Sequence, residues 1–85
     1  MIKETSFYEL LEKEKEAVNN YNFVISLIDD LKKYVYNQKQ TKNCDIESLK
    51  RYHDSQIECY LSRKEDAETQ IKIARKNILE YFQKL

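Results

Sequence analysis

The sequence contains neither glycine nor proline among its 85 residues. The tight turns of β-hairpins and the loops of β-sandwiches depend on these residue types, so their complete absence argues against all-β and α/β folds. It also excludes glycine-rich phosphate loops and dinucleotide-binding fingerprints. The sequence therefore predicts an all-α protein.

A heptad pattern of apolar side chains begins at Phe7 and advances by alternating steps of three and four residues. Its positions are Phe7, Leu10, Glu14, Ala17, Tyr21, Val24, Ile28, Leu31, Val35 and Gln38. Eight of these ten are apolar or aromatic, which is typical of the seam of a coiled-coil helix. Ser6 and Glu9 fit a capping box at its start. The pattern predicts a first helix over about residues 6–39.

Two further apolar strips flank this seam. Leu11, Val18 and Ile25 each follow a seam position and widen the stripe on one side. The strip on the other flank consists of Phe23, Leu27 and Tyr34. A single partner helix would not cover both strips, so the pattern indicates the surface of a helical bundle.

A second helix is predicted over about residues 46–84, after a polar connection at about residues 40–45. Asp45 is a suitable N-cap because its carboxylate can accept backbone N–H groups of the first turn. The expected seam is Ile46, Lys50, His53, Ile57, Tyr60, Lys64, Ala67, Ile71, Ala74, Ile78, Tyr81 and Leu85. The whole chain, residues 1–85, then forms one helical-hairpin domain. A three-helix alternative breaks the first helix at Asn19-Asn20, although the seam continues in phase there.

Two long helices with one short connection fold into an antiparallel hairpin. If the turn is centred near residue 42, Phe7 lies opposite Ile78 and Ala17 lies opposite Ala67. A layer of two alanines is thin, and a second hairpin can fill it, for example with Tyr21. Because a chain of this size buries little apolar surface alone, we expect dimerisation into a four-helix bundle.

Charge is balanced overall but segregated along the chain. The 15 basic and 15 acidic residues cancel, so no global field favours nucleic acid or anionic lipid. Residues 1–31 carry three bases and seven acids, whereas residues 32–51 carry six bases and two acids. The basic residues at the hairpin tip are Lys32, Lys33, Lys39, Lys42, Lys50 and Arg51, beside Tyr34, Tyr36 and Tyr52. Such a tip can bind phosphates and stack on bases, or contact an acidic protein surface, including another copy.

The residue types of catalytic and metal sites do not form a productive pattern. Cys44, Cys59 and His53 lack the close spacing of zinc ligands, and the two cysteines lie too far apart on helix for an internal disulfide. We expect free thiols, with a disulfide between subunits through Cys44 as the alternative. Consecutive helical residues point about 100° apart, so His53-Asp54-Ser55 is not expected to converge as a triad. No enzyme activity, cofactor or metal is predicted.

Residues 55–59, Ser-Gln-Ile-Glu-Cys, resemble the Ser-Gln-x-x-Asp signature of small helical-hairpin phosphatases that act on aspartyl-phosphate in sporulating bacteria. The resemblance covers only these five residues, and Cys59 stands where that family has its aspartate. The chain is therefore not assigned to that family.

The first functional hypothesis is a small protein-interaction module that binds and modulates a larger protein partner, such as a phage or mobile-element inhibitor of a host or defence enzyme. Lysine outnumbers arginine 12 to 3, which is typical of AT-rich bacterial and phage genes. The candidate partner-binding residues are Phe23, Leu27, Tyr34, Tyr36 and Tyr52. The simpler interpretation is that they form a homodimer interface.

Two other function classes remain as alternatives. One is a dimeric nucleic-acid-binding regulator that uses the basic tip, and the other is an adaptor or chaperone for a secreted partner. No apolar run approaches 18 residues and the N-terminus lacks the apolar core of a signal peptide. The expected location is therefore the cytoplasm, without membrane contact.

Overall fold

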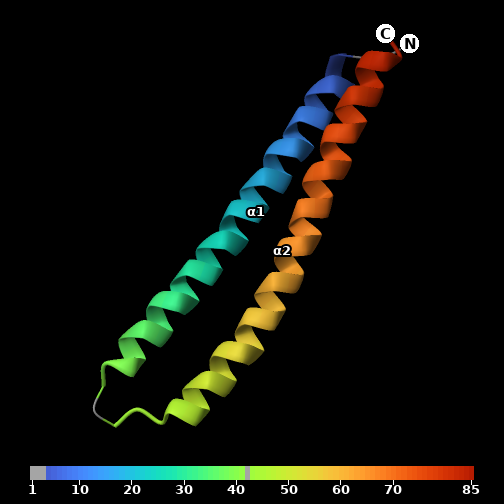
Figure 1. Cartoon of the computed structure of the whole chain (residues 1–85). Coiled ribbons are helices and arrows are strands. Elements are labelled where there is room, and N and C mark those ends of the chain that lie inside the picture. The colour runs from blue at the N-terminus through green and yellow to red at the C-terminus, as the bar shows by residue number, and fades with distance from the viewer. Residues whose placement is uncertain (1–3, 42) are drawn as a thin grey trace.

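The computed structural model describes residues 4–41 and 43–85. Two helices, α1 (Glu4–Lys39) and α2 (Ile46–Gln83), fold back on each other as an antiparallel hairpin (Figure 1). The molecule is a rod of 66 × 15 × 12 Å, and the described residues contain no strand. The prediction of an all-α helical hairpin is confirmed.

Helix α1 is continuous through Asn19 and Asn20, so the three-helix alternative is wrong. It is already helical at Glu4, which places Ser6 inside the first turn. The predicted capping box at Ser6 is therefore also wrong. Serine is only weakly unfavourable within a helix, so a Ser-x-x-Glu pattern does not by itself prevent the helix from beginning earlier.

The reversal between the helices is stabilised by short polar side chains. At the end of α1, the backbone N–H and the hydroxyl of Thr41 both donate to the carbonyl of Gln38, at 3.1 and 2.6 Å. At the start of α2, the carboxylate of Asp45 accepts from the backbone N–H and the hydroxyl of Ser48, at 3.3 and 2.8 Å. No described residue has a positive φ, so none of the described residues of the turn requires glycine. The predicted N-cap at Asp45 is confirmed.

The buried core is small and unevenly distributed. Toward the tip it consists of Val24, Ile28, Leu31 and Leu49. Toward the open end, only Ala67 and Ala74 are buried among the described residues. The ten predicted seam positions of α1 are all buried or half-buried, which confirms that seam.

The predicted seam of α2 is wrong in its first two turns and at its last position, Leu85, which is 76% exposed and lies beyond the end of α2. Leu49 is 8% exposed and occupies the core, whereas Ile46 is 55% exposed and Lys50 is also exposed. A seam through Leu49 and His53 buries a leucine instead of a lysine, and the resulting phase shift is small enough for a short stretch of helix to accommodate.

The register of the two helices differs from the prediction. The ring of Phe7 stacks on that of Tyr81, one turn of α2 beyond the expected partner Ile78, with ring centroids 5.0 Å apart. Ala17 shares a groove with Gln70 and Ala74 instead of lying opposite Ala67. Because a slide of one turn moves each seam residue onto the next, the heptad pattern cannot distinguish these registers.

Within the described residues, neither helix combines the length and the apolar character that crossing a membrane requires.

Candidate interaction surfaces

Helix α2 covers the seam of α1 but leaves large apolar side chains exposed on both sides of the rod. The exposed residues are Tyr8, Leu11, Phe23, Tyr34, Tyr36, Ile46, Tyr52, Leu61, Ile73, Leu79, Phe82 and Leu85. These twelve outnumber the six buried apolar residues of the described chain. The prediction that one partner helix would not cover both flanking strips is confirmed, since Leu11 and Phe23 stay exposed on opposite flanks.

One side, called here the Phe23 side, consists of Phe23, Leu27, Tyr34, Tyr52 and Ile73. Residues seven apart on a helix lie almost in line, so Leu27 and Tyr34 form one row of α1, with Phe23 beside it. At the tip the rings of Tyr34 and Tyr52 meet edge to face, with centroids 5.4 Å apart. This contact links α1 to α2 and extends the apolar surface across both helices.

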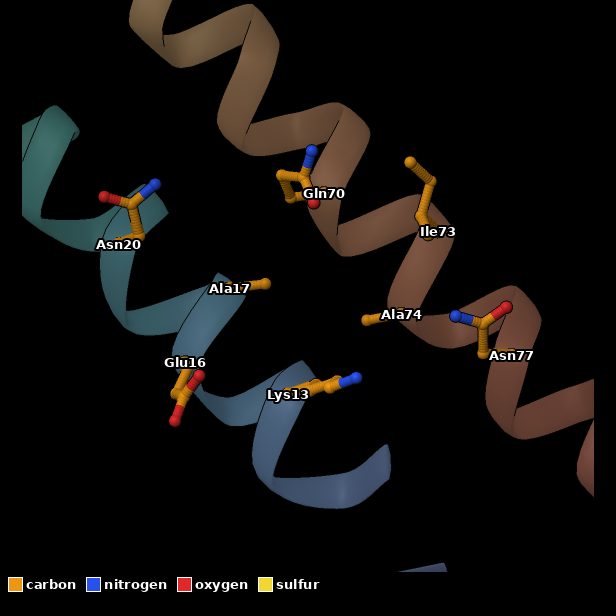
Figure 2. A pocket seen from close by; sticks show the side chains of 8 residues that line it. All are labelled: Lys13, Glu16, Ala17, Asn20, Gln70, Ile73, Ala74 and Asn77. Atoms are coloured by element: carbon orange, nitrogen blue, oxygen red, sulfur yellow. The ribbon is translucent and has the colours of Figure 1, made fainter. Parts of the chain in front are cut away.

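A groove of about 480 Å³ opens on the Phe23 side, toward the open end of the rod (Figure 2). It is lined by Lys13, Glu16, Ala17, Asn20, Gln70, Ile73, Ala74 and Asn77. Figure 2 shows Ala17 and Ala74 pointing toward each other, with Lys13 extending from α1 toward α2. Because both facing residues have only a methyl group, the two helices do not fill the space between them here.

The other side, called here the Tyr36 side, contains a basic groove near the tip. Lys32, Val35, Tyr36, Lys39 and His53 line a depression of about 180 Å³. An adjoining depression of about 220 Å³ shares three of these residues and adds Lys50, Ile46 and Leu49. Three lysines therefore converge beside a tyrosine and a histidine, over an apolar floor.

The ammonium groups of this basic groove are not neutralised by nearby acids. Within the described part of the chain, no carboxylate oxygen lies within 4.0 Å of the Nζ atoms of Lys32, Lys39 or Lys50. Of the side chains that line the groove, His53 does lie near a carboxylate, because its Nδ1 is 3.2 Å from Oδ1 of Asp54. The short carboxylate of Asp54 thus reaches the ring of the preceding residue, although consecutive helical residues point about 100° apart. Among the described residues, Ser55 makes no hydrogen bond with either.

The predicted candidate residues separate onto the two sides. Four of the five partner-binding candidates lie on the Phe23 side, and Tyr36 lies on the opposite one. Of the basic candidates, Lys32, Lys39 and Lys50 share the basic groove. Lys33 and Arg51 are exposed but do not line it, and Lys42 lies outside the described residues.

Sequence reasoning missed part of the Tyr36 side. Tyr8, Leu61 and Phe82 are exposed and were not among the candidates. Leu61 and Phe82 belong to one row of α2 that also contains Arg75, at multiples of seven residues. That spacing was a usable signal, but the two charged residues between them in the row, Glu68 and Arg75, concealed it.

The charged seam residue Glu14 has a specific partner. Its Oε2 lies 3.4 Å from Nε of Arg75, so this pair bridges α1 and α2 on the Tyr36 side. Near the tip, the pKa of the Asp45 carboxyl is lowered from 3.8, chiefly by the hydrogen bond from the Ser48 hydroxyl and then by the Ser48 backbone N–H. Both cysteines are free thiols, and the described residues hold no cluster of three metal-ligating side chains.

Comparison with known proteins finds no match among family models, curated proteins or solved structures.

Proposed function

We propose that this chain is a non-catalytic protein-interaction module whose exposed apolar sides bind other protein surfaces. The observation that carries the proposal is the excess of exposed over buried large apolar side chains. The accessible surface is 6948 Å², against about 5,400 Å² for a compact monomer of this mass. The radius of gyration is 19.2 Å, against about 12 Å for a compact domain of this length. Such a surplus of surface is characteristic of proteins that complete their core by association.

The partner in this proposal is a larger protein whose activity the hairpin modulates. The lysine-rich composition favours a phage or mobile-element inhibitor of a host or defence enzyme, acting in the cytoplasm. Rigid aromatic side chains such as Phe23 and Tyr36 are the type of anchor that dominates protein interfaces.

The test is site-specific photo-crosslinking in lysate from the native host. A photoreactive phenylalanine analogue replaces Phe23 or Tyr36, with Glu65 and Lys76 as matched controls on the outer face of α2. We expect Phe23, Tyr36 or both to trap a stoichiometric protein that survives nuclease treatment, and neither control to do so. Equal trapping from all four positions, or none from any, would contradict the proposal.

The basic groove favours a second candidate function, which is binding of single-stranded nucleic acid. Unpaired lysines neutralise phosphates, and the Tyr36 ring can stack on a base. The affinity for a short RNA or DNA strand should fall steeply with salt, and Lys32→Glu or Lys39→Glu should reduce it. Lys76→Glu is the control, since this lysine lies on α2 outside the groove. Equal effects of the three substitutions would argue against the groove.

A further inference from the structure

We infer that a second copy of this chain covers the Phe23 side, in a four-helix bundle of two antiparallel hairpins with Phe23 beside the two-fold axis. The tip of each hairpin then lies beside the open end of the other. In this arrangement Leu27 of each copy enters the groove between Ala17 and Ala74 of the other. The inference rests on the proposed function, and it names the partner that binds the Phe23 side of the rod. The Tyr36 side stays free for a different protein.

The area argument favours a partner as large as the chain itself. The hairpin exposes about 1,500 Å² more than a compact monomer of its mass. If each of two copies covered that surplus, the interface would total about 3,000 Å², within the usual range of about 2,000–5,000 Å² for obligate homodimers. A short peptide could not cover the same surface on a rod 66 Å long.

The position of Phe23 suits a two-fold axis. In a symmetric dimer of overlapping rods, residues at the middle of each rod meet their own copies. The middle of α1 (Glu4–Lys39) lies between residues 21 and 22, so Phe23 is about 2 Å from it along the helix. Phe23 is 55% exposed in the hairpin, and an aromatic ring near the centre of an interface is a typical anchor.

The groove and the neighbouring leucine are placed symmetrically about that axis. Ala17 lies about 7 Å from the middle of α1 toward the open end, and Leu27 lies about 8 Å from it toward the tip. A two-fold rotation therefore brings Leu27 of one copy opposite Ala17 of the other. The groove of about 480 Å³ has room for this side chain, and filling it restores the packing that two alanines leave incomplete.

The charge distribution favours the antiparallel orientation of the two hairpins. Residues 1–31 have a net charge of −4, from three bases and seven acids, and residues 32–51 have +4, from six bases and two acids. Antiparallel packing of the hairpins places the basic tip of one copy beside the acidic first half of α1 of the other. Parallel packing would bring the two basic tips together, which is repulsive.

Cysteine cross-linking tests the contact and its orientation, in a chain with Cys44→Ser and Cys59→Ser. Asn20 and Asn22 lie at nearly the same height on α1, but only Asn20 lines the groove of the Phe23 side. We expect Asn20→Cys to form a disulfide-linked dimer on mild oxidation, and Asn22→Cys to remain monomeric on a non-reducing gel. Efficient cross-linking of Asn22→Cys, or none of Asn20→Cys, would overturn the inference.

The orientation is read from Leu27→Cys. Alone it should not cross-link, because its two copies would lie about 16 Å apart, beyond the ~7 Å that a disulfide spans between Cα atoms. When the Leu27→Cys chain is mixed with the Ala17→Cys chain, we expect a disulfide-linked dimer of one chain of each kind. Cross-linking of Leu27→Cys to itself would overturn the antiparallel arrangement. If no pair cross-links while a photoreactive group at Phe23 still traps a different protein, this inference fails and the proposed function stands.

Discussion

The ring of Phe7 stacks on the ring of Tyr81, with centroids 5.0 Å apart and planes inclined by 26°. Phe82 adds an edge-to-face contact with Phe7 at 5.3 Å. This aromatic cluster joins α1 and α2 at the open end of the rod, where Ala67 and Ala74 are the buried residues of the described chain. It therefore fixes the register that the heptad pattern alone leaves undetermined.

We predict that Phe7 and Tyr81 are energetically coupled. A double-mutant cycle with Phe7→Leu and Tyr81→Leu should give a coupling free energy of about 0.5–1.5 kcal/mol, because a stacked pair is worth that much beyond its buried area. Urea denaturation followed by circular dichroism measures it. The control pairs Tyr81→Leu with Tyr8→Leu, for which the two losses should simply add. Coupling of Phe7 to Ile78 instead of Tyr81 would show that the other register is populated.

The core at the tip half should dominate stability. Leu31 is 5% exposed, and Leu31→Ala should lower the free energy of unfolding by about 2–4 kcal/mol through lost burial and a cavity. Leu85 is 76% exposed, and Leu85→Ala should change it by less than about 0.5 kcal/mol. The same denaturation measurement applies. Equal effects of the two substitutions would contradict the hairpin packing.

Asp45 should stabilise the fold in a pH-dependent way. Its pKa is lowered in the folded chain, chiefly by the Ser48 hydroxyl, so its contribution is complete above the ordinary pKa of 3.8 and disappears as pH falls through the lower folded value. Asp45→Asn keeps a capping side chain but removes its charge, so it should lower the Tm slightly at pH 7, and the difference should vanish as the carboxyl is protonated in acid.

Asp29→Asn is the matched control for Asp45, since Asp29 lies inside α1 and caps no helix start. Its effect on the Tm should be smaller at pH 7. A Tm loss for Asp45→Asn that persists below pH 2 would point to a cause other than the ionised cap.

The ion pair between Glu14 and Arg75 should matter little for stability. Both side chains are partly solvated, with 33% and 62% exposed, and exposed pairs contribute at most about 1 kcal/mol. A double-mutant cycle with Glu14→Gln and Arg75→Gln should give a coupling within that bound, and 1 M NaCl should reduce it further. A larger, salt-insensitive coupling would mean that the pair is shielded from water, as it would be beneath a partner.

Much of the fold follows from local rules in the sequence. The α1 seam and the Asp45 cap were predictable, because periodicity and capping act within a few residues of each other. The register was not, because sliding by one turn replaces Ile78 with Tyr81 and keeps the same face inside. That Leu49 and not the predicted Lys50 lies in the seam of α2 depends on how the tip is packed, which the pattern does not contain.

The surfaces were less predictable than the fold. The sequence identified Phe23, Leu27 and Tyr34 as a strip that one helix would not cover. The helical phase also separates Tyr34 from Tyr36, which point about 200° apart on either side of Val35, but the candidates were grouped by residue type and not by flank. The groove at Ala17 and Ala74 depends on the register, so its lining could not be derived from the pattern.

The central claim is that two copies of the hairpin associate through the Phe23 side. Sedimentation equilibrium of the purified chain at micromolar concentration tests it most directly. The account predicts twice the single-chain mass of 10.3 kDa, and a return to the single mass for Phe23→Glu with unchanged helical content. A stable, fully helical monomer at all concentrations would contradict the association of two copies through the Phe23 side.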